Sequence, residues 1–250
     1  MIVTLSIHNK QYRADLSKAL DISIPLRAGE KNVNAFYIPP VTIEPFSMGS
    51  FVGDVIQGGS CNVNNISFNP HGNGTHTECV GHIAKEKFTI NQCLKEFFFV
   101  AKLITLSPEK KGEDRVVTGN QLKAALGAEK PQAIIIRTLP NTDDKLNRQY
   151  SGTNPPFLDA EAASFLAKSE VKHLLLDVPS IDREDDGGKL SAHHAFWKYP
   201  ENTRMDCTIT ELIFVPNVIE DGTYLLNIQI ASFENDASPS KPVLYRLSEA

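Results

Sequence analysis

The sequence from Asn69 to Ile83 reads Asn-Pro-His-Gly-Asn-Gly-Thr-His-Thr-Glu-Cys-Val-Gly-His-Ile, and the rest of the chain can be interpreted around it. Three of the seven histidines lie in this stretch, with Glu78 between the second and the third. Imidazole nitrogens and carboxylate oxygens are the usual protein ligands of a catalytic divalent metal. The glycines let the backbone turn tightly and approach an ion closely. The stretch therefore predicts a metal or catalytic site.

The spacing of these residues favours the same interpretation. Side chains two residues apart in an extended chain point to the same face. If residues 75–82 are extended, His76, Glu78 and His82 share one face and Cys79 lies on the opposite one. Two of the three can then share a metal, and the third can act as a base. The alternative is a polar, glycine-rich loop with solvated histidines, which the shared parity disfavours.

The composition describes an ordinary globular protein of 250 residues, 41% of them hydrophobic and 22% charged. The formal net charge of −5 gives no reason to expect a nucleic acid or an anionic membrane as a partner. The four cysteines form no Cys-x-x-Cys pair, and no apolar run approaches the length of a membrane span. Residues 1–8 lack the pattern of a signal peptide. These features predict a cytoplasmic protein with free thiols.

The order of predicted elements indicates an α/β fold with mixed parallel and antiparallel sheets. Strands are expected at residues 2–7, 11–16, 96–106, 133–137, 172–178, 208–216, 222–232 and 243–247. Helices are expected at residues 89–95, 118–126 and 157–169. The strand, helix and strand between residues 133 and 178 form a βαβ unit, which implies a partly parallel sheet.

The segments between these elements are also distinctive. Residues 34–69 are rich in Pro, Gly and Asn, which predicts irregular structure with short strands. Residues 139–156 predict a long loop, and residues 8–10 predict a hairpin turn. The apolar run Phe97-Phe98-Phe99 is expected to pack in the core.

The second half of a site is expected far along the chain, because catalytic ligands usually come from several strand ends and loops. Asp177 ends a predicted buried strand, where open α/β sheets bind ligands, and leads into Asp177-Val-Pro-Ser-Ile-Asp182. His193 and His194 follow a glycine-containing stretch. Glu211 lies in an apolar strand, where a carboxylate needs a partner or a metal. The alternative for Glu211 is an edge position facing solvent.

These motifs resemble those of the cyclase family, which includes bacterial kynurenine formamidase and isatin hydrolase. The family signature is His-x-Gly-Thr-His-x-Asp-x-Pro-x-His, and this chain has His71-Gly-Asn-Gly-Thr-His-Thr-Glu-Cys-Val-Gly-His82. The similarity continues in Asp15-Leu-Ser17, in residues 157–163 and 177–182, and in the later His-His and Glu segments. It implies that residues 1–250 form a single domain of the swivelling β/β/α architecture, found as a homodimer or a larger homo-oligomer.

The resemblance also implies a metal and a reaction. Members of the family bind one or two divalent ions, commonly Zn²⁺, or Mn²⁺ in isatin hydrolases, and hydrolyse a small-molecule amide or lactam. The implied metal ligands are His71, His76, Glu78, His193 and Glu211, with His194 as the competitor for the place of His193. The last histidine of the signature, His82, is implied to transfer protons.

Three departures from the signature bear on the site. Glu78 replaces an aspartate and is longer by one methylene, which changes where a metal would lie. One extra residue separates His71 from Gly74, and Val80-Gly81 replaces the signature proline. Each departure can change the number of metals or the substrate.

The favoured hypothesis is a metal-dependent hydrolase that cleaves an amide-type C–N bond, as in arylformamidases. A metal lowers the pKa of its bound water to near neutral, and the resulting hydroxide attacks a carbonyl. His82 would act as general acid and base, since imidazole titrates near neutral pH. The alternatives are a lactam or ester hydrolase or a cyclase on the same site, and a catalytically inactive metal-binding module. A nucleophilic hydrolase is disfavoured, because the sequence has no Gly-x-Ser-x-Gly elbow and Cys79 points away.

Overall fold

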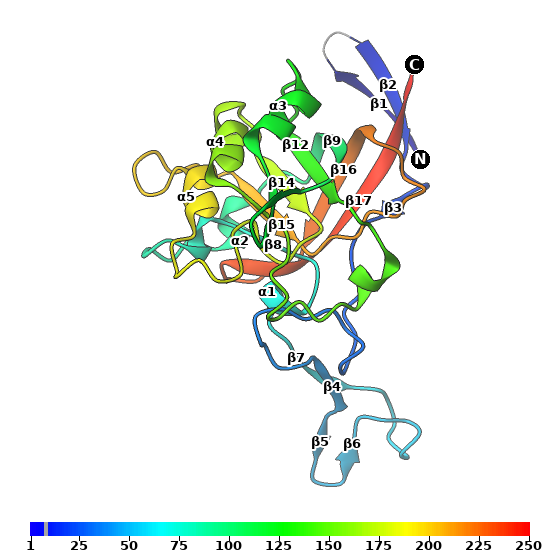
Figure 1. Ribbon diagram of the computed structural model, residues 1–250. Coiled ribbons are helices and arrows are strands. Elements are labelled where there is room, and N and C mark those ends of the chain that lie inside the picture. Colours follow the sequence, from blue (N-terminus) through cyan, green and yellow to red (C-terminus); the bar gives the residue numbers. More distant parts are fainter. Residues whose placement is uncertain (8–9) are drawn as a thin grey trace.

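A large mixed sheet dominates the structure, a computed structural model that describes residues 1–7 and 10–250 (Figure 1). Its strands are hydrogen-bonded in the order β1-β2-β17-β16-β9-β12-β14-β15-β8, with β3 beside β17. The bounds are β1 Ile2–Ile7, β2 Lys10–Asp15, β3 Leu20–Asp21, β8 His76–Glu78, β9 Phe98–Leu106, β12 Ala133–Thr138, β14 His173–Leu176, β15 Thr208–Glu211, β16 Gly222–Ile230 and β17 Ala237–Glu249. Neighbours among β9, β12, β14 and β15 pair in parallel, whereas the remaining pairs are antiparallel.

Strand β8 closes this sheet on itself. It pairs antiparallel with residues 209–211 of β15 on one side and with residues 237–239 of β17 on the other. The strands from β17 through β16, β9, β12, β14 and β15 to β8 therefore form a barrel-like ring. The strand that carries part of the histidine-rich stretch thus has backbone partners along both edges.

Three helices cover the parallel strands on one side (Figure 1): α3 Gly119–Leu126, α4 Ala160–Lys168 and α5 Ser191–Trp197. Alternate side chains of β12 face opposite ways, so Ile134 and Ile136 pack in the cluster that contains these helices. Ile135 packs in a second apolar cluster with residues of β9, β16 and β17. Both faces of β12 are buried, as the continuous apolar run of its sequence predicts.

Shorter elements connect the main ones. The short helices are α1 Pro70–Asn73, η1 Val80–His82, α2 Ile90–Cys93 and η2 Asp143–Leu146. A small sheet contains β10 Glu109–Lys111, β11 Asp114–Val117 and β13 Phe157–Leu158. Two hairpin-like pairs, β4 Thr42–Pro45 with β7 Asn64–Ser67 and β5 Ser47–Met48 with β6 Phe51–Val52, form an arm that extends away from the large sheet (Figure 1). Among the described residues, no helix is long and apolar enough to cross a membrane.

The predicted α/β fold with mixed sheets is confirmed, and β12, α4 and β14 form the expected parallel βαβ unit. Several predicted boundaries differ from the structure, most of all for β17, which is predicted at residues 243–247 and spans Ala237–Glu249. Two of the other differences have a clear local cause. Helix α4 begins at Ala160, three residues late, because Phe157 and Leu158 pair with β11 and the Asp159 side chain caps the helix. Strand β15 ends at Glu211, earlier than predicted, because Leu212 adopts a φ of 53°.

Two further expectations concern single residues. The prediction of core packing is right for Phe99, which is buried, and wrong for Phe97 and Phe98, which are 38% and 51% exposed. Phe98 begins strand β9, and Phe97 directly precedes it. The hairpin turn predicted at residues 8–10 includes two residues outside the described range.

Candidate metal centre

Local backbone conformation brings the histidine-rich stretch together. Asn69 caps the single turn of α1 by accepting a hydrogen bond from the backbone N–H of His71. Gly72 lies so close to Ile38 and the Ala35 carbonyl that a Cβ there would clash with both, so the turn needs a glycine. Strand β8 then places His76 and Glu78 on one face, as their spacing predicts.

The His82 side chain also lies beside Glu78, but its backbone conformation differs from the predicted one. Its segment is the 3-10 turn η1 rather than an extended chain. This turn carries the His82 ring back over β8, with Nδ1 3.7 Å from Glu78 Oε2. The parity argument therefore holds for His76 and Glu78, whereas the convergence of His82 depends on the turn.

Glu78 is the centre of the cluster, and its side chain is fully buried. Its Oε2 lies 3.2 Å from His71 Nδ1, and its Oε1 lies 3.1 Å from His193 Nε2. Imidazoles from α1 and α5 thus meet around a carboxylate from β8. The extra residue between His71 and Gly74 does not remove His71 from this group.

His76 and Glu211 form a second pair, directly opposite each other on the antiparallel strands β8 and β15. His76 Nε2 lies 3.3 Å from Glu211 Oε2, and both side chains are buried. The other nitrogen, Nδ1, donates to the Gly74 carbonyl at 3.0 Å, which leaves Nε2 as the nitrogen with a free lone pair. Glu211 Oε1 accepts a hydrogen bond from the Ile181 N–H at 2.9 Å. The solvent-facing alternative for Glu211 is wrong.

Helix α5 supplies His193, and Asp182 orients it. The Asp182 carboxylate accepts from the N–H groups of Ala192 and His193 at the start of α5, and from His193 Nδ1 at 2.6 Å. This hydrogen bond turns His193 Nε2 towards Glu78. The neighbouring His194 instead contacts the Tyr199 carbonyl through Nδ1 at 3.2 Å. Of the two adjacent histidines, His193 is the one that faces the cluster.

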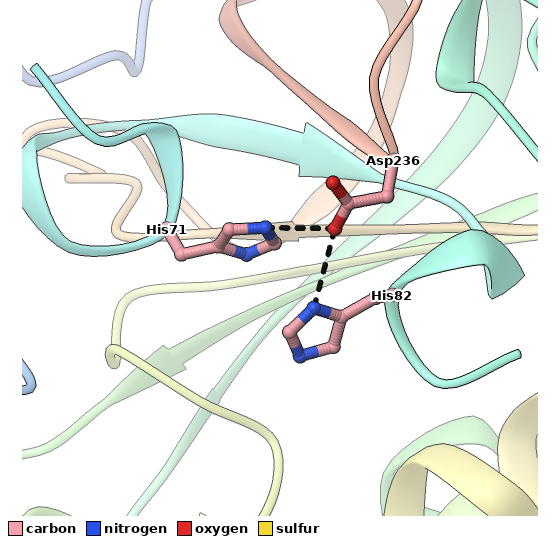
Figure 2. Close-up of side chains that lie close together, drawn as sticks. All are labelled: His71, His82 and Asp236. Atoms are coloured by element: carbon pink, nitrogen blue, oxygen red, sulfur yellow. Dashed lines mark hydrogen bonds and ion pairs between the residues drawn. The ribbon is translucent and has the colours of Figure 1, made fainter. Parts of the chain in front are cut away.

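Asp236 is a member of the cluster that the sequence did not single out. It directly precedes β17, and Figure 2 shows its carboxylate between two imidazole rings. Its Oδ2 lies 2.9 Å from His71 Nε2 and 3.4 Å from His82 Nδ1. The available signal was an acidic residue in a polar connection after a predicted strand, which is too common to identify a site.

Burial and charge together set the protonation of the cluster in the absence of a metal. Burial lowers the pKa of His193, but Asp182 and Glu78 outweigh this effect and raise it to about 10. Burial likewise opposes the charged form of His71, whereas Asp236 and Glu78 raise its pKa to about 10. The surrounding imidazoles hold the Glu78 pKa well below its usual value despite the cost of burial. The metal-free cluster therefore holds carboxylates and imidazolium groups in close contact.

The donor atoms fit a divalent metal. Among the described residues, His76 Nε2 and Glu78 Oε2 are buried and have no partner with hydrogen-bond geometry, although a buried polar atom normally has one. The contacts of 3.3 Å from His76 Nε2 to Glu211 Oε2 and 3.2 Å from Glu78 Oε2 to His71 Nδ1 are close ionic contacts of poor hydrogen-bond geometry. Three groups have ligand atoms within 4.8 Å of one another: His71, His76 and Glu78; Glu78, His82 and His193; and His71, His82 and Asp236. Two ligands on a tetrahedral shell with bonds of about 2.0–2.2 Å stand about 3.3 Å apart. The separations of 3.1 to 3.3 Å from His71 to Glu78, His193 to Glu78 and His76 to Glu211 match this spacing.

Two residues considered from the sequence lie outside the cluster. Asp177 is bound by the Thr138 N–H and by Lys145 Nζ at 2.7 Å, so it belongs to a buried ion pair. Cys79 points away from the cluster, as predicted, and is fully buried. A hydrogen bond with Cys93, together with burial, raises the pKa of the Cys79 thiol far above its usual value. A thiol in this state is a poor nucleophile.

A cavity of about 320 Å³ opens onto the cluster, a size that suits a small molecule. His71, His82 and Glu211 line one part of it, and Phe36 and Leu190 add apolar surface. Both apolar residues adopt a positive φ, 58° and 45°. Such strain in residues other than glycine is concentrated at functional sites.

The rim of this cavity is acidic, but its carboxylates accept hydrogen bonds from backbone N–H groups of the surrounding loops. Glu184 accepts from the N–H groups of Gly152 and Asn154. Asp186 accepts from the backbone N–H of Leu190 and of the two residues before it. The one arginine of the rim, Arg183, is bound to Asp114 at 2.9 Å.

Comparisons with known proteins agree with this fold. The model of the Cyclase family matches residues 15–183. The kynurenine formamidase of Bacillus cytotoxicus is 28% identical over 190 residues, which cover 75% of this chain and 82% of that protein. A potential metal-dependent hydrolase with cyclase activity has a TM-score of 0.66 at 16% identity, covering 91% of this chain and 97% of that one. Isatin hydrolase A of Labrenzia aggregata has a TM-score of 0.68 at 14% identity, covering 91% and 93%.

Proposed function

The chain belongs to the cyclase family, and from this premise we propose that it is a metal-dependent hydrolase that cleaves an amide-type C–N bond in a small molecule. The observation that carries the proposal is the pair of buried atoms without a hydrogen-bond partner, His76 Nε2 and Glu78 Oε2, beneath a cavity of about 320 Å³. The kynurenine formamidase relatives favour an aryl formamide as the substrate class.

Five side chains of this chain would hold the metal: His71, His76, Glu78, His193 and Glu211. A bound divalent ion supplies a polarised carbonyl and a water of lowered pKa, and Zn²⁺ is the proposed ion, with Mn²⁺ as the alternative. Glu78 lies between the His71 and His193 sides and can serve one ion or two through its two oxygens. Each of its two oxygens lies beside a different imidazole, Oε2 beside His71 and Oε1 beside His193.

His82 is the proposed general acid and base. It lines the cavity, it is 29% exposed, and it lies farther from Glu78 than His71 or His193 does. Because Asp236 accepts from Nδ1, the free nitrogen is Nε2, on the far side of the ring. This nitrogen can remove a proton from the attacking water and return it to the leaving amine. Phe36 and Leu190 would hold the apolar part of the substrate and exclude water.

The proposal is tested by hydrolysis assays on metal-stripped protein reloaded with Zn²⁺ or Mn²⁺. N-formylkynurenine serves as the formamide probe and isatin as the lactam probe. Turnover of the formamide with either ion supports the proposal. Preferential turnover of isatin would favour the lactam hydrolase instead, which the isatin hydrolase neighbour makes the second candidate. Tight metal binding with no turnover of any amide or ester would contradict an enzymatic role.

A substitution separates binding from proton transfer. We expect His82→Ala to bind Zn²⁺ with nearly wild-type affinity, because the donors around Glu78, His76 and His193 remain. We expect kcat to fall by about 10²–10⁴-fold, the usual contribution of a general acid and base. Metal content by elemental analysis and steady-state kinetics measure the two effects. Loss of metal with retained turnover would reverse the assigned role.

A further inference from the structure

Asp236 is the acidic member of the cluster that the proposed ligand set and the proposed base leave without a role. It lies outside the segment that the Cyclase family model matches, residues 15–183. Its carboxylate is 24% exposed, and its Oδ2 faces two rings at once, His71 Nε2 at 2.9 Å and His82 Nδ1 at 3.4 Å (Figure 2). Both rings belong to the proposed machinery, so one oxygen contacts a proposed ligand and the proposed base.

The backbone holds this carboxylate firmly in place. The Asp236 carbonyl accepts from the Cys79 N–H at 3.0 Å, and the next residue, Ala237, pairs with Glu78 in the sheet. On the other side, the Asn235 carbonyl accepts from the Ile90 N–H at 2.8 Å. The segment before β17 is thus bound to β8 and α2. A side chain on such a segment can fix the orientation of a ring that contacts it.

When a ring is neutral, as a metal ligand or a base must be, its contacts decide which nitrogen carries the hydrogen. An ionised carboxylate only accepts hydrogen bonds, so His71 Nε2 and His82 Nδ1 must both donate to Asp236. His71 Nδ1, 3.2 Å from Glu78 Oε2, is then the nitrogen available to a metal. His82 Nε2 is the nitrogen available to a substrate proton. The Asp236 carboxylate therefore determines which nitrogen of His71 is free to bind a metal and which nitrogen of His82 is free to accept a proton.

We propose that Asp236 is the positioning residue of the site, which holds His71 as a metal ligand through Nδ1 and His82 as a base through Nε2. This inference rests on the proposed function. A carboxylate that accepts the second N–H of a ligating histidine fixes the ring and makes it a better ligand. Asp236 is better suited to this role than to direct ligation, because its Oδ2 already accepts from two N–H donors. Within the described cluster, the buried atoms that lack a hydrogen-bond partner are instead His76 Nε2 and Glu78 Oε2.

The first test is metal affinity, which needs no substrate. Zn²⁺ affinity is measured by competition with a chromophoric chelator for the wild type, Asp236→Ala and Asp236→Asn. We expect Asp236→Ala to bind Zn²⁺ about 10–100-fold more weakly at unchanged stoichiometry, as is usual for the carboxylate behind a ligating histidine. Wild-type affinity in this variant overturns the proposal. Loss of a whole metal equivalent at saturating Zn²⁺ also overturns it, because Asp236 would then be a ligand itself.

The matched control is Glu234→Gln. Glu234 lies two residues earlier and binds Thr89 and Asn91 rather than the imidazoles, so its loss of charge should leave Zn²⁺ affinity unchanged. If Asp236→Ala fails to fold, Asp236→Asn keeps the shape of the side chain and one accepting oxygen. Weakened binding in that variant supports the proposal, and wild-type affinity contradicts it.

The second test determines which ring nitrogen of His82 carries the hydrogen. In Zn²⁺-loaded protein labelled with ¹⁵N-histidine, we expect the His82 ring to carry its hydrogen on Nδ1 in the wild type and to lose this preference in Asp236→Ala. An unchanged tautomer overturns the proposal. We also expect kcat to fall more than KM changes. If the wild type binds Zn²⁺ but hydrolyses none of the probes, the proposed function fails, while the affinity and tautomer experiments still decide the role of Asp236.

Discussion

At the scale of single residues, Glu78 has an unusual environment because it is a buried carboxylate close to three imidazoles. Its oxygens lie 3.1 Å from His193, 3.2 Å from His71 and 3.7 Å from His82. An isolated buried charge is costly, so in the metal-free protein protonated rings must balance it. The same attraction to Glu78 helps to raise the pKa of His71 and of His193 to about 10 each.

This balance predicts how the stability of the metal-free protein depends on pH. The folded state raises the pKa of His193 to about 10, above the unfolded value of about 6.5. The resulting stabilisation is fully present below about pH 6.5 and is lost as pH rises through about 10. We therefore expect the Tm of chelator-treated protein to fall between pH 7 and pH 10, measured by differential scanning calorimetry. His193→Gln should flatten this slope, and a Tm that rises over the same range would contradict the charged cluster.

Zn²⁺ binding should show the opposite trend over the same range. A histidine must lose its proton to bind a metal, so Zn²⁺ competes with the protons on His71 and His193. Zn²⁺ affinity should therefore increase with pH up to about 10, where both rings become neutral. Calorimetric titrations in buffers of different ionisation enthalpy would measure the released protons. Both rings should release their protons at neutral pH, and the release should decrease only as pH approaches about 10. Zn²⁺ binding without proton release at neutral pH would contradict this assignment.

The sequence predicted these residues unevenly, for physical reasons. His76 and Glu78 were predictable because two residues of one strand share a face whatever the tertiary fold. Their convergence with His193 and Glu211 was implied by the family resemblance rather than by any local pattern. Asp236 was missed because its role depends on β17 pairing with β8, a long-range contact with no trace in the neighbouring residues.

At the scale of elements, the segment around Phe36 shows backbone strain beside the cavity. Phe36 and Tyr37 are consecutive and have φ values of 58° and 54°. The neighbouring hydrogen bonds hold this conformation, from the Ala35 N–H to the Gly72 carbonyl and from the Tyr37 N–H to Ser151 Oγ. A left-handed conformation costs a residue with a side chain about 1–2 kcal/mol. The segment bears this strain where it places an aromatic ring in the cavity wall.

A pair of glycine substitutions separates strain from substrate contact. Phe36→Gly removes the cavity wall, so we expect KM to rise, about 10-fold or more, for a substrate with an apolar group. Relief of strain offsets the greater freedom of the unfolded chain, but the ring also packs against an apolar cluster that includes Ile24 and Val33. Loss of this packing should lower the free energy of unfolding by about 1–3 kcal/mol. Tyr37→Gly is the control: it relieves the same strain, but Tyr37 is 78% exposed and does not line this cavity. Equal KM values for the two variants would show that Phe36 does not contact the substrate.

At the scale of the whole molecule, the metal should stabilise the fold, because its proposed ligands come from α1, β8, α5 and β15. An ion that binds only the native state, at 100 times its Kd, stabilises it by about 2.7 kcal/mol. We expect Zn²⁺ to raise the Tm and excess chelator to lower it, measured by thermal unfolding. His76→Gln removes one of the donors and should reduce this shift. A Tm that does not respond to Zn²⁺ would show that the cluster does not bind the ion in solution.

The fold class was predictable because the continuous apolar runs of β12 and β14 identify strands buried on both faces. The closure of the sheet was not predictable, because β8 has only three residues and its partners lie far along the chain. The exposure of Phe97 and Phe98 was likewise a matter of tertiary arrangement, since composition alone favours their burial. The homodimer and the cytoplasmic location stay predictions.

The closure of the ring by β8 also has a kinetic consequence. Residues 76–78 must find partners at 209–211 and 237–239, and contacts of such long sequence separation slow folding. We expect the pairings of β8 with β15 and with β17 to form late in folding. The transition state for folding would then lack the assembled ligand set. An ion bound there would then leave the refolding rate nearly unchanged and slow unfolding. Stopped-flow measurements of refolding and unfolding with and without Zn²⁺ would test this expectation. A bound ion would then act on the closed ring only by slowing its opening.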